Sequence, residues 1–80
     1  MKRYNEYISR ISMIKIHAEN AKEAGLLDFN SMLEYLKNDA IIKNEALEDE
    51  ILTDSEKDVV EYVAEKVAFD INELYEEVRR

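Results

Sequence analysis

Hydrophobic residues recur every three or four positions along most of the chain, the spacing that lines one face of an α-helix. The first stripe predicts a helix from about Arg3 to Ala24. Gly25 follows, and glycine readily adopts the left-handed conformation that often ends a helix, so we expect the chain to turn there. The stripe consists of Tyr4, Tyr7, Ile11, Ile14, Ala18 and Ala21.

The clearest helix is predicted at the C-terminal end. Thr53 and Glu56 have the spacing of a capping box, in which each side chain accepts a hydrogen bond from the other residue's backbone N–H. Arg79 and Arg80 suit the negative end of the helix dipole. About 25 residues would make a rod of roughly 38 Å. The hydrophobic stripe of this helix consists of Val60, Val63, Val67, Ile71, Leu74 and Val78.

A middle helical region follows the segment "LLDFNS". Either Asp28 or Ser31 is expected to cap its first turn, because both residue types accept hydrogen bonds from orphan N–H groups. Ser31 and Glu34 also have capping-box spacing. The hydrophobic stripe expected here consists of Phe29, Leu33, Leu36, Ala40 and Leu47.

The middle region is less regular than its neighbours. Lys43 falls within its stripe, whereas Ile41 and Ile42 point away from it. Asn38 and Asp39 are adjacent weak helix formers, so we expect a break or change of register between them. The middle segment is therefore expected to be either one kinked helix or two short ones.

Composition supports an all-α fold. One glycine and no proline leave few of the turn residues that strands need to reverse direction. We predict one domain over residues 1–80, a small antiparallel three-helix bundle whose middle helix is kinked or split in two. The expected core includes Ile11, Ile14, Leu33, Leu36, Val63, Val67, Ile71 and Leu74.

Negative charge is concentrated in one part of the chain. The net charge is −8, and residues 45–61 alone carry eight acids and one base. Residues 1–22 instead carry five bases and two acids. Because nucleic-acid binding depends largely on neutralising phosphates, a net negative chain is not expected to bind DNA or RNA directly.

The same acidic stretch has part of the spacing of a calcium-binding loop. From Asp54, acids occupy calcium-loop positions 1, 3, 5 and 12, but Val59 replaces the glycine that the sharp turn requires. His17 is the only histidine and has no glutamate three positions before it, so a di-iron ligand set is not formed. There is no cysteine, and no serine lies in a glycine-rich elbow. We therefore expect the protein to have no enzymatic activity and to bind no metal ion or cofactor.

A binding surface is the functional interpretation of the acidic residues. Tyr62 and Phe69 lie seven positions apart on the side of the last helix opposite its stripe, and acids project to the same side. Aromatic anchors supply buried area, while charges steer a basic partner. Two simpler explanations remain: the acids confer solubility, and the middle segment covers the aromatic residues. The candidate partner-binding residues are Glu48, Asp49, Glu50, Asp58, Tyr62, Glu65, Phe69, Glu73 and Glu76.

The first helix has an uncharged strip opposite its core stripe. Small neutral side chains let another helix approach closely, so this strip is a candidate for self-association or for a partner helix; chance is the competing explanation. Its residues are Asn5, Ser9, Ser12, Ile16 and Asn20.

We therefore expect a non-enzymatic protein that occupies a basic surface of a partner, most plausibly a surface that normally holds nucleic acid. It would act as a stoichiometric inhibitor or an antitoxin. In size, acidity and helical content the chain resembles small phage-encoded inhibitors of host or defence proteins, including anti-CRISPR proteins and DNA mimics, although no shared motif carries that likeness.

The alternative is a helical oligomerisation or scaffold module whose acids serve only solubility. A third interpretation is a regulatory partner of a toxin or signalling enzyme. The charged N-terminus has neither the apolar core of a signal peptide nor the run needed to span a bilayer. We expect an unprocessed cytoplasmic protein, in the host cytoplasm if it is viral.

Overall fold

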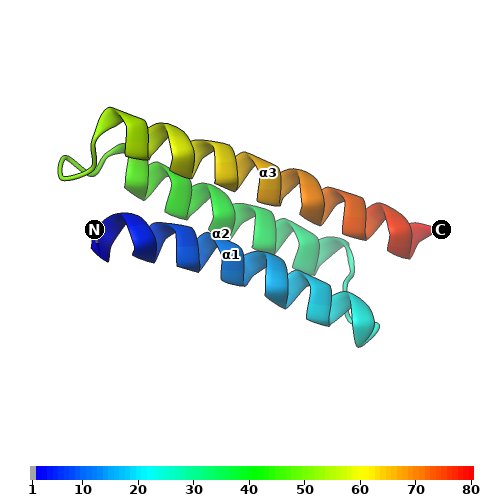
Figure 1. Ribbon diagram of the computed structural model, residues 1–80. Helices are drawn as coiled ribbons and strands as arrows, with labels where there is room; N and C mark the ends of the chain where they lie inside the picture. Colours follow the sequence, from blue (N-terminus) through cyan, green and yellow to red (C-terminus); the bar gives the residue numbers. More distant parts are fainter. Residues whose placement is uncertain (1) are drawn as a thin grey trace.

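Three helices run alternately up and down and pack against one another in the computed structural model, which describes residues 2–80 (Figure 1). They are α1 (Lys2–Glu23), α2 (Phe29–Leu47) and α3 (Asp54–Arg79). The N-terminal end of α1 and the C-terminal end of α3 lie at opposite ends of the bundle (Figure 1). The molecule measures 42 × 16 × 15 Å. The predicted all-α three-helix bundle is confirmed.

Both outer helices bury the faces that their hydrophobic spacing predicts. In α1, Tyr4 and Ala21 are half-buried at the edges of the stripe. In α3, Val63 and Leu74 are half-buried, and Ala64 joins the core unpredicted. Val78 is 44% exposed, because it lies at the end of α3 where the neighbouring helices end. Seven residues of the two predicted stripes are buried: Tyr7, Ile11, Ile14, Ala18, Val60, Val67 and Ile71.

The helix ends have the caps that satisfy their free backbone groups. Gly25 has a φ of 74°, the left-handed conformation expected of it. At the start of α3, Thr53 N–H donates to Glu56 Oε1 over 2.9 Å, and Glu56 N–H donates to Thr53 Oγ1 over 3.1 Å. At the start of α2 the cap is Asp28, whose carboxylate accepts from the Ser31 N–H over 2.8 Å. Ser31 is therefore the third residue of the helix, and its predicted pairing with Glu34 is wrong.

The middle helix corrects two expectations. It runs from Phe29 to Leu47 without interruption, so Asn38 and Asp39 do not split it. Its buried face is also rotated from the predicted stripe: Leu33 is 45% exposed and Phe29 is 54% exposed. The residues that α2 buries are Met32, Asp39, Ile42 and Ala46.

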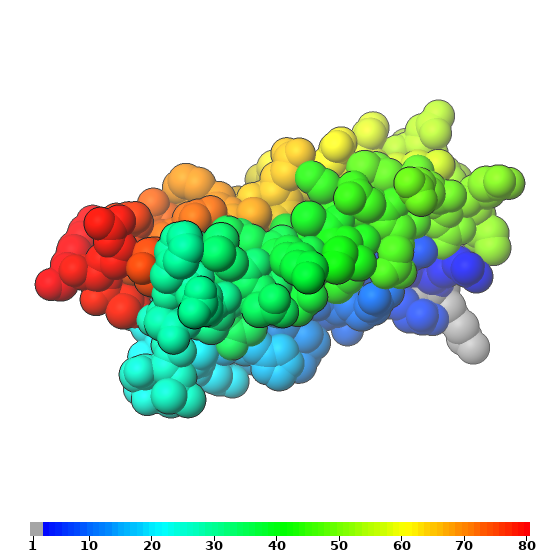
Figure 2. All heavy atoms as spheres, turned by 180° about the vertical axis from the view of Figure 1, so that it is seen from behind, coloured from blue at the N-terminus to red at the C-terminus, as the bar shows by residue number. Residues whose placement is uncertain are grey.

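The buried face of α2 has a charged residue at its centre. The helix packs against both α1 and α3, and Figure 2 shows it crossing the middle of the far side with α3 along one edge and α1 along the other. The charged residue is Asp39, which is only 4% exposed. A hydrophobicity pattern assigns such a residue to the surface and shifts the predicted face.

None of the helices within residues 2–80 combines the length and apolar composition needed to cross a bilayer.

Candidate partner-binding surface

The side of α3 that points away from the other helices carries two large aromatic residues. Tyr62 is 65% exposed and Phe69 is 59% exposed, so the middle helix does not cover them. Seven residues apart, they lie about 10 Å apart along the helix axis. The four acidic residues predicted for this side are all exposed. This outer face of α3 consists of Asp58, Tyr62, Glu65, Phe69, Glu73 and Glu76.

The acids of the outer face have little internal neutralisation. Within residues 3–80, no lysine or arginine forms an ion pair with Asp58, Glu65 or Glu73. Glu76 pairs with Arg79 over 3.2 Å, but both side chains are more than half exposed, and such pairs are weak. The outer face therefore presents uncompensated negative charge beside exposed aromatic rings.

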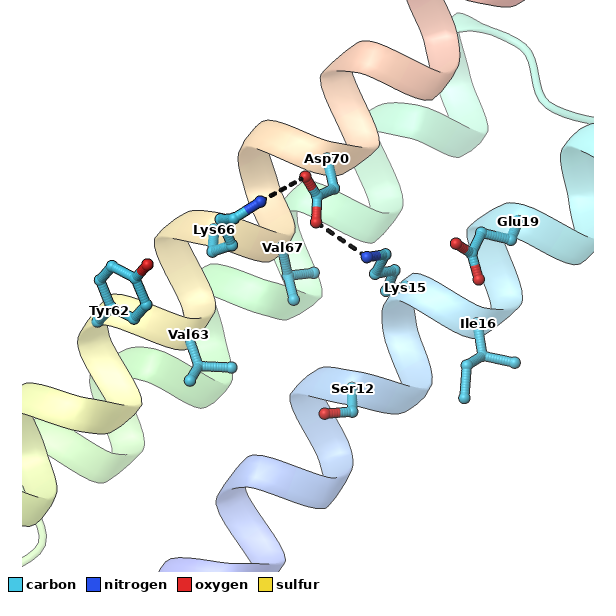
Figure 3. Close-up of a pocket in the computed structure, with 9 residues that line it drawn as sticks. All are labelled: Ser12, Lys15, Ile16, Glu19, Tyr62, Val63, Lys66, Val67 and Asp70. Atoms are coloured by element: carbon cyan, nitrogen blue, oxygen red, sulfur yellow. Dashed lines mark hydrogen bonds and ion pairs between the residues drawn. The ribbon is translucent and has the colours of Figure 1, made fainter.

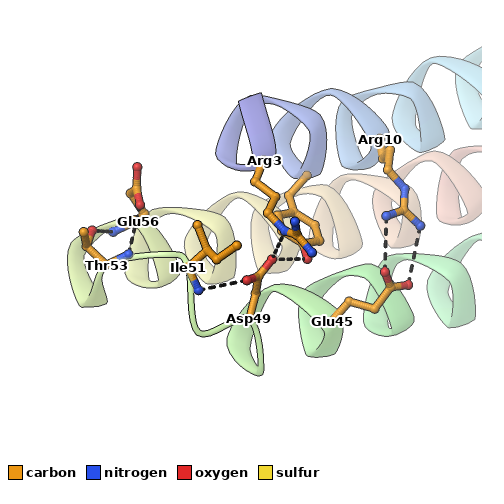
Figure 4. A network of polar contacts seen from close by, with 8 residues as sticks. Arg3, Arg10, Glu45, Asp49, Ile51, Thr53 and Glu56 are labelled. Atoms are coloured by element: carbon orange, nitrogen blue, oxygen red, sulfur yellow. Dashed lines mark hydrogen bonds and ion pairs between the residues drawn. The ribbon is translucent and has the colours of Figure 1, made fainter. Parts of the chain in front are cut away.

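Asp49 has a role in the fold that its sequence context did not indicate. Its carboxylate accepts hydrogen bonds from Arg3 Nε over 2.6 Å, Tyr7 Oη over 2.8 Å and the Ile51 N–H over 3.0 Å (Figure 4). The side chain is only 7% exposed. These bonds tie the start of α1 to the connection between α2 and α3.

The titration of Asp49 reflects these contacts. The Ile51 N–H, the Tyr7 hydroxyl and the Arg3 guanidinium all stabilise the carboxylate, so they lower the pKa of Asp49 below its ordinary value. Burial and the bond to Asp49 raise the pKa of Tyr7. Asp49 is thus ionised and already occupied by partners in its own chain.

The other two members of the predicted acidic triplet differ from Asp49. Glu48 and Glu50 are exposed and form no side-chain hydrogen bond or ion pair within residues 3–80. They line a shallow hollow with Arg3 and Tyr7 of α1. The structure therefore groups them with α1, at the end of the bundle, and separately from the outer face.

The acidic stretch of residues 45–61 consequently does not form one surface. Glu45 pairs with Arg10 of α1 over 3.3 Å (Figure 4). Glu56 caps α3, and Asp54 is the first residue of that helix, where the dipole favours negative charge. Part of the stretch thus holds the helices together, and Asp58 begins the outer face.

The uncharged strip of α1 is also exposed, with Ile16 at 45%. A hollow of about 410 Å³ beside it lies between α1 and α3 and is bordered by Ser12, Ile16, Tyr62 and Val63 (Figure 3). A second hollow lies between α1 and α2, where Met13 and Ile41 are both more than 40% exposed. The strip therefore lies between two partly apolar hollows.

An ion-pair bridge between α1 and α3 forms one side of the first hollow. Asp70 accepts from Lys15 of α1 over 3.0 Å and from Lys66 over 3.3 Å (Figure 3). These two cations lower the pKa of Asp70, with Lys15 the stronger influence. This bridge could not be predicted from the sequence, because Lys15 and Asp70 are 55 positions apart and are brought together only by helix packing.

The acids with calcium-loop spacing belong to a regular helix. Asp54, Glu56 and Asp58 lie in α3, so they do not form a calcium loop. In the part of the chain that the structure describes, no three acidic, histidine or cysteine side chains gather closely enough to hold a metal ion. His17 is exposed at the rim of the hollow between α1 and α2.

Comparison with known proteins gives no relative: no protein-family model, no curated protein and no solved structure matches the chain significantly.

Proposed function

We propose that the protein is a small non-enzymatic binding module whose outer face occupies a basic surface of a partner protein. The observation that carries this proposal is the exposure of Tyr62 and Phe69 beside Asp58, Glu65 and Glu73, which have no basic partner within residues 3–80. Exposed large aromatics beside several unpaired acids have the composition of a specific interface, and Lys66, which lines the same hollow as Tyr62, is already paired with Asp70.

The charge density of this surface indicates how it would work. Asp58 and Glu76 are 18 positions apart, about 27 Å along the helix, and four acids in that length give one charge per roughly 7 Å. One strand of DNA carries a charge every 3.4 Å or so. The outer face has the sign of a nucleic-acid backbone but about half the density of one strand, so its charges would steer a partner more than hold it.

The aromatic residues would supply the binding energy. A buried tyrosine or phenylalanine removes 150–250 Å² from water, and well over half of each side chain is available here. At about 25 cal/mol per Å², burying the exposed part would contribute roughly 2 to 4 kcal/mol for each ring. Tyr62 and Phe69 are therefore the anchors, and the acids select a basic surface around them.

The class of partner follows from that surface. A basic site wide enough for a rod of some 27 Å is typical of proteins that bind a nucleic-acid backbone. We propose that the protein blocks such a site stoichiometrically, as an inhibitor or an antitoxin. Glu48 and Glu50 would add to the steering field from the end of the bundle, while Asp49 holds the fold together.

The test is the binding of a partner captured from cells in which the chain is naturally made. Glu65→Lys with Glu73→Lys should slow association and weaken its dependence on salt, because these charges accelerate encounter. Glu23→Lys with Glu34→Lys is the matched control, since it changes the net charge equally at exposed positions of α1 and α2. The outer-face variant should lose much more of the association rate than the control.

The anchors and the occluded site need separate measurements. Tyr62→Ala with Phe69→Ala should speed dissociation without changing the dependence on salt. The wild-type protein should displace a labelled oligonucleotide from the partner at one-to-one stoichiometry. If the outer-face charge reversal binds as fast and tightly as its control at low salt, the proposed surface is wrong; if only the oligonucleotide is not displaced, the class of site is wrong.

Self-association through the strip on α1 is the second candidate function. The observation that favours it is the exposure of Ile16 between two hollows that also expose Met13, Ile41 and Tyr62. In this scaffold function the acids serve solubility alone. Sedimentation of the wild-type protein distinguishes the two functions, because a bundle that remains monomeric at high micromolar concentration has no scaffold role of this kind.

A further inference from the structure

A carboxyl group lies in the core of the bundle without a partner. Asp39 is 4% exposed, in the middle of α2 between Met32 and Ala46 on the buried face. Its Oδ1 atom is shut off from solvent and has no hydrogen-bond partner in the described part of the chain. Burying an ionised carboxylate without a compensating bond is strongly unfavourable, so this group disfavours tight packing whenever it is charged.

The charged groups around Asp39 do not compensate it. Lys43, one turn further along α2, is the one charge that acts on it noticeably, and no ion pair forms between them in the described residues. His17 of α1 lines the same hollow as Asn38, the residue before Asp39 in α2. α1 and α3 otherwise bring buried apolar residues to the core. Lys15 and Lys66 line the hollow between α1 and α3, where both are bound to Asp70.

α2 contributes fewer buried hydrophobic side chains to the core than either of its neighbours. Among the described side chains, α2 buries three hydrophobic residues, whereas α1 and α3 each bury four. Two ion pairs join α1 to α3 and one, between Arg10 and Glu45, joins α1 to α2, but none joins α2 to α3 within residues 3–80. Phe29 and Leu33 of α2 are about half exposed. This is the helix that carries the uncompensated carboxyl group.

We propose that Asp39 is a pH-sensitive switch in the core, neutral while α2 is packed against α1 and α3 and ionised when α2 loosens enough for water to reach it. This inference does not depend on the proposed function, because it concerns the inner face of α2. α2 would therefore stay packed against α1 and α3 in mildly acidic conditions and would separate from them more often at neutral pH.

The sign follows from proton linkage. Burial raises the pKa of Asp39 to about 6 from an ordinary value of 3.8, with Lys43 opposing the rise. The packed form therefore binds the proton more tightly than the unfolded chain does. Its contribution to stability is fully present below pH 3.8 and is lost as the pH rises through about 6. Asp28, Asp49, Asp70 and Glu77 act oppositely and at lower pH, since their pKa values are lowered.

The experiment compares urea unfolding of the full chain with that of Asp39→Asn and Asp39→Leu between pH 4.5 and 7.5. All proteins carry His17→Gln, so that the chain contains no histidine. Relative to either variant, the folding equilibrium constant of the protein with Asp39 should fall about 25-fold across the range, or about 1.9 kcal/mol. Two substitutions are used so that poor packing of one does not decide the result.

Two measurements on the protein that retains Asp39 complete the test. The carboxyl carbon resonance of Asp39 should titrate with a midpoint near pH 6. Hydrogen exchange, corrected for intrinsic rates, should show α2 opening more often at pH 7.5 than at pH 5, with a smaller change in α1 and α3. A midpoint near pH 4, or a stability ratio that is flat across the range, overturns the switch. Equal changes in all three helices overturn the loosening of α2.

Discussion

Met32 and Leu33 are adjacent residues of similar size whose truncation tests the face that α2 buries. Met32 is 6% exposed, and Leu33 is 45% exposed. Met32→Ala removes three heavy atoms from the core, at about 0.8 kcal/mol for each methylene-sized group plus the cost of a cavity. The loss should be about 2 to 3 kcal/mol, near the low end for buried methionine, because the site lies in the first turn of α2 where neighbours can relax.

Leu33→Ala should cost about 1 kcal/mol or less, since roughly half of that side chain is already in water. Helix propensity affects the two substitutions almost equally and cancels from the comparison. Urea unfolding followed by circular dichroism measures both losses as shifts of the midpoint at a constant slope. A Leu33 variant that loses as much stability as the Met32 variant, or more, would show that α2 buries the originally predicted stripe.

Three further substitutions test other parts of the structure. Gly25→Ala should lose about 1 kcal/mol in urea unfolding, because a φ of 74° is strained for a residue with a Cβ atom; no loss would contradict this turn. Asp49→Asn should reduce the fall in stability below about pH 4, since a lowered pKa gives stability that is present above the ordinary value and lost on acidification; an unchanged acid limb in thermal melts would count against the Asp49 network. Ser12→Glu with Ile16→Glu should convert any oligomer formed through the α1 strip into a folded monomer by sedimentation, and a persisting oligomer would exclude that strip.

The outer helices could be predicted from the sequence because their physics is local. The hydrophobic period of α1, the left-handed glycine at its end and the Thr53 capping box each depend on residues within a few positions of one another. The exposure of Tyr62 and Phe69 could not be predicted in the same way, because it depends on the face of α3 against which α2 packs. Their placement opposite the core stripe could be predicted, but whether α2 covers them could not.

The continuity of the middle helix and the hydrogen bonds of Asp49 could not be predicted, because both depend on how the helices pack. Asp39 interrupts the hydrophobic pattern at the centre of a buried face, so the pattern indicated a break where the helix continues. The bonds of Asp49 to Arg3 and Tyr7 join residues more than 40 positions apart. Such contacts arise from helix packing, and an acid that serves the fold looks the same in a sequence as one that serves a partner.

The most direct test of the central claim is an NMR footprint of the captured partner on the labelled protein. Backbone amide signals near Tyr62 and Phe69 on α3 should shift or broaden on binding, whereas those of Asn5 and Ser9, the part of the α1 strip that does not border the hollow beside Tyr62, should change little. A footprint confined to the uncharged strip of α1, with the signals around Tyr62 and Phe69 unchanged, would contradict the claim.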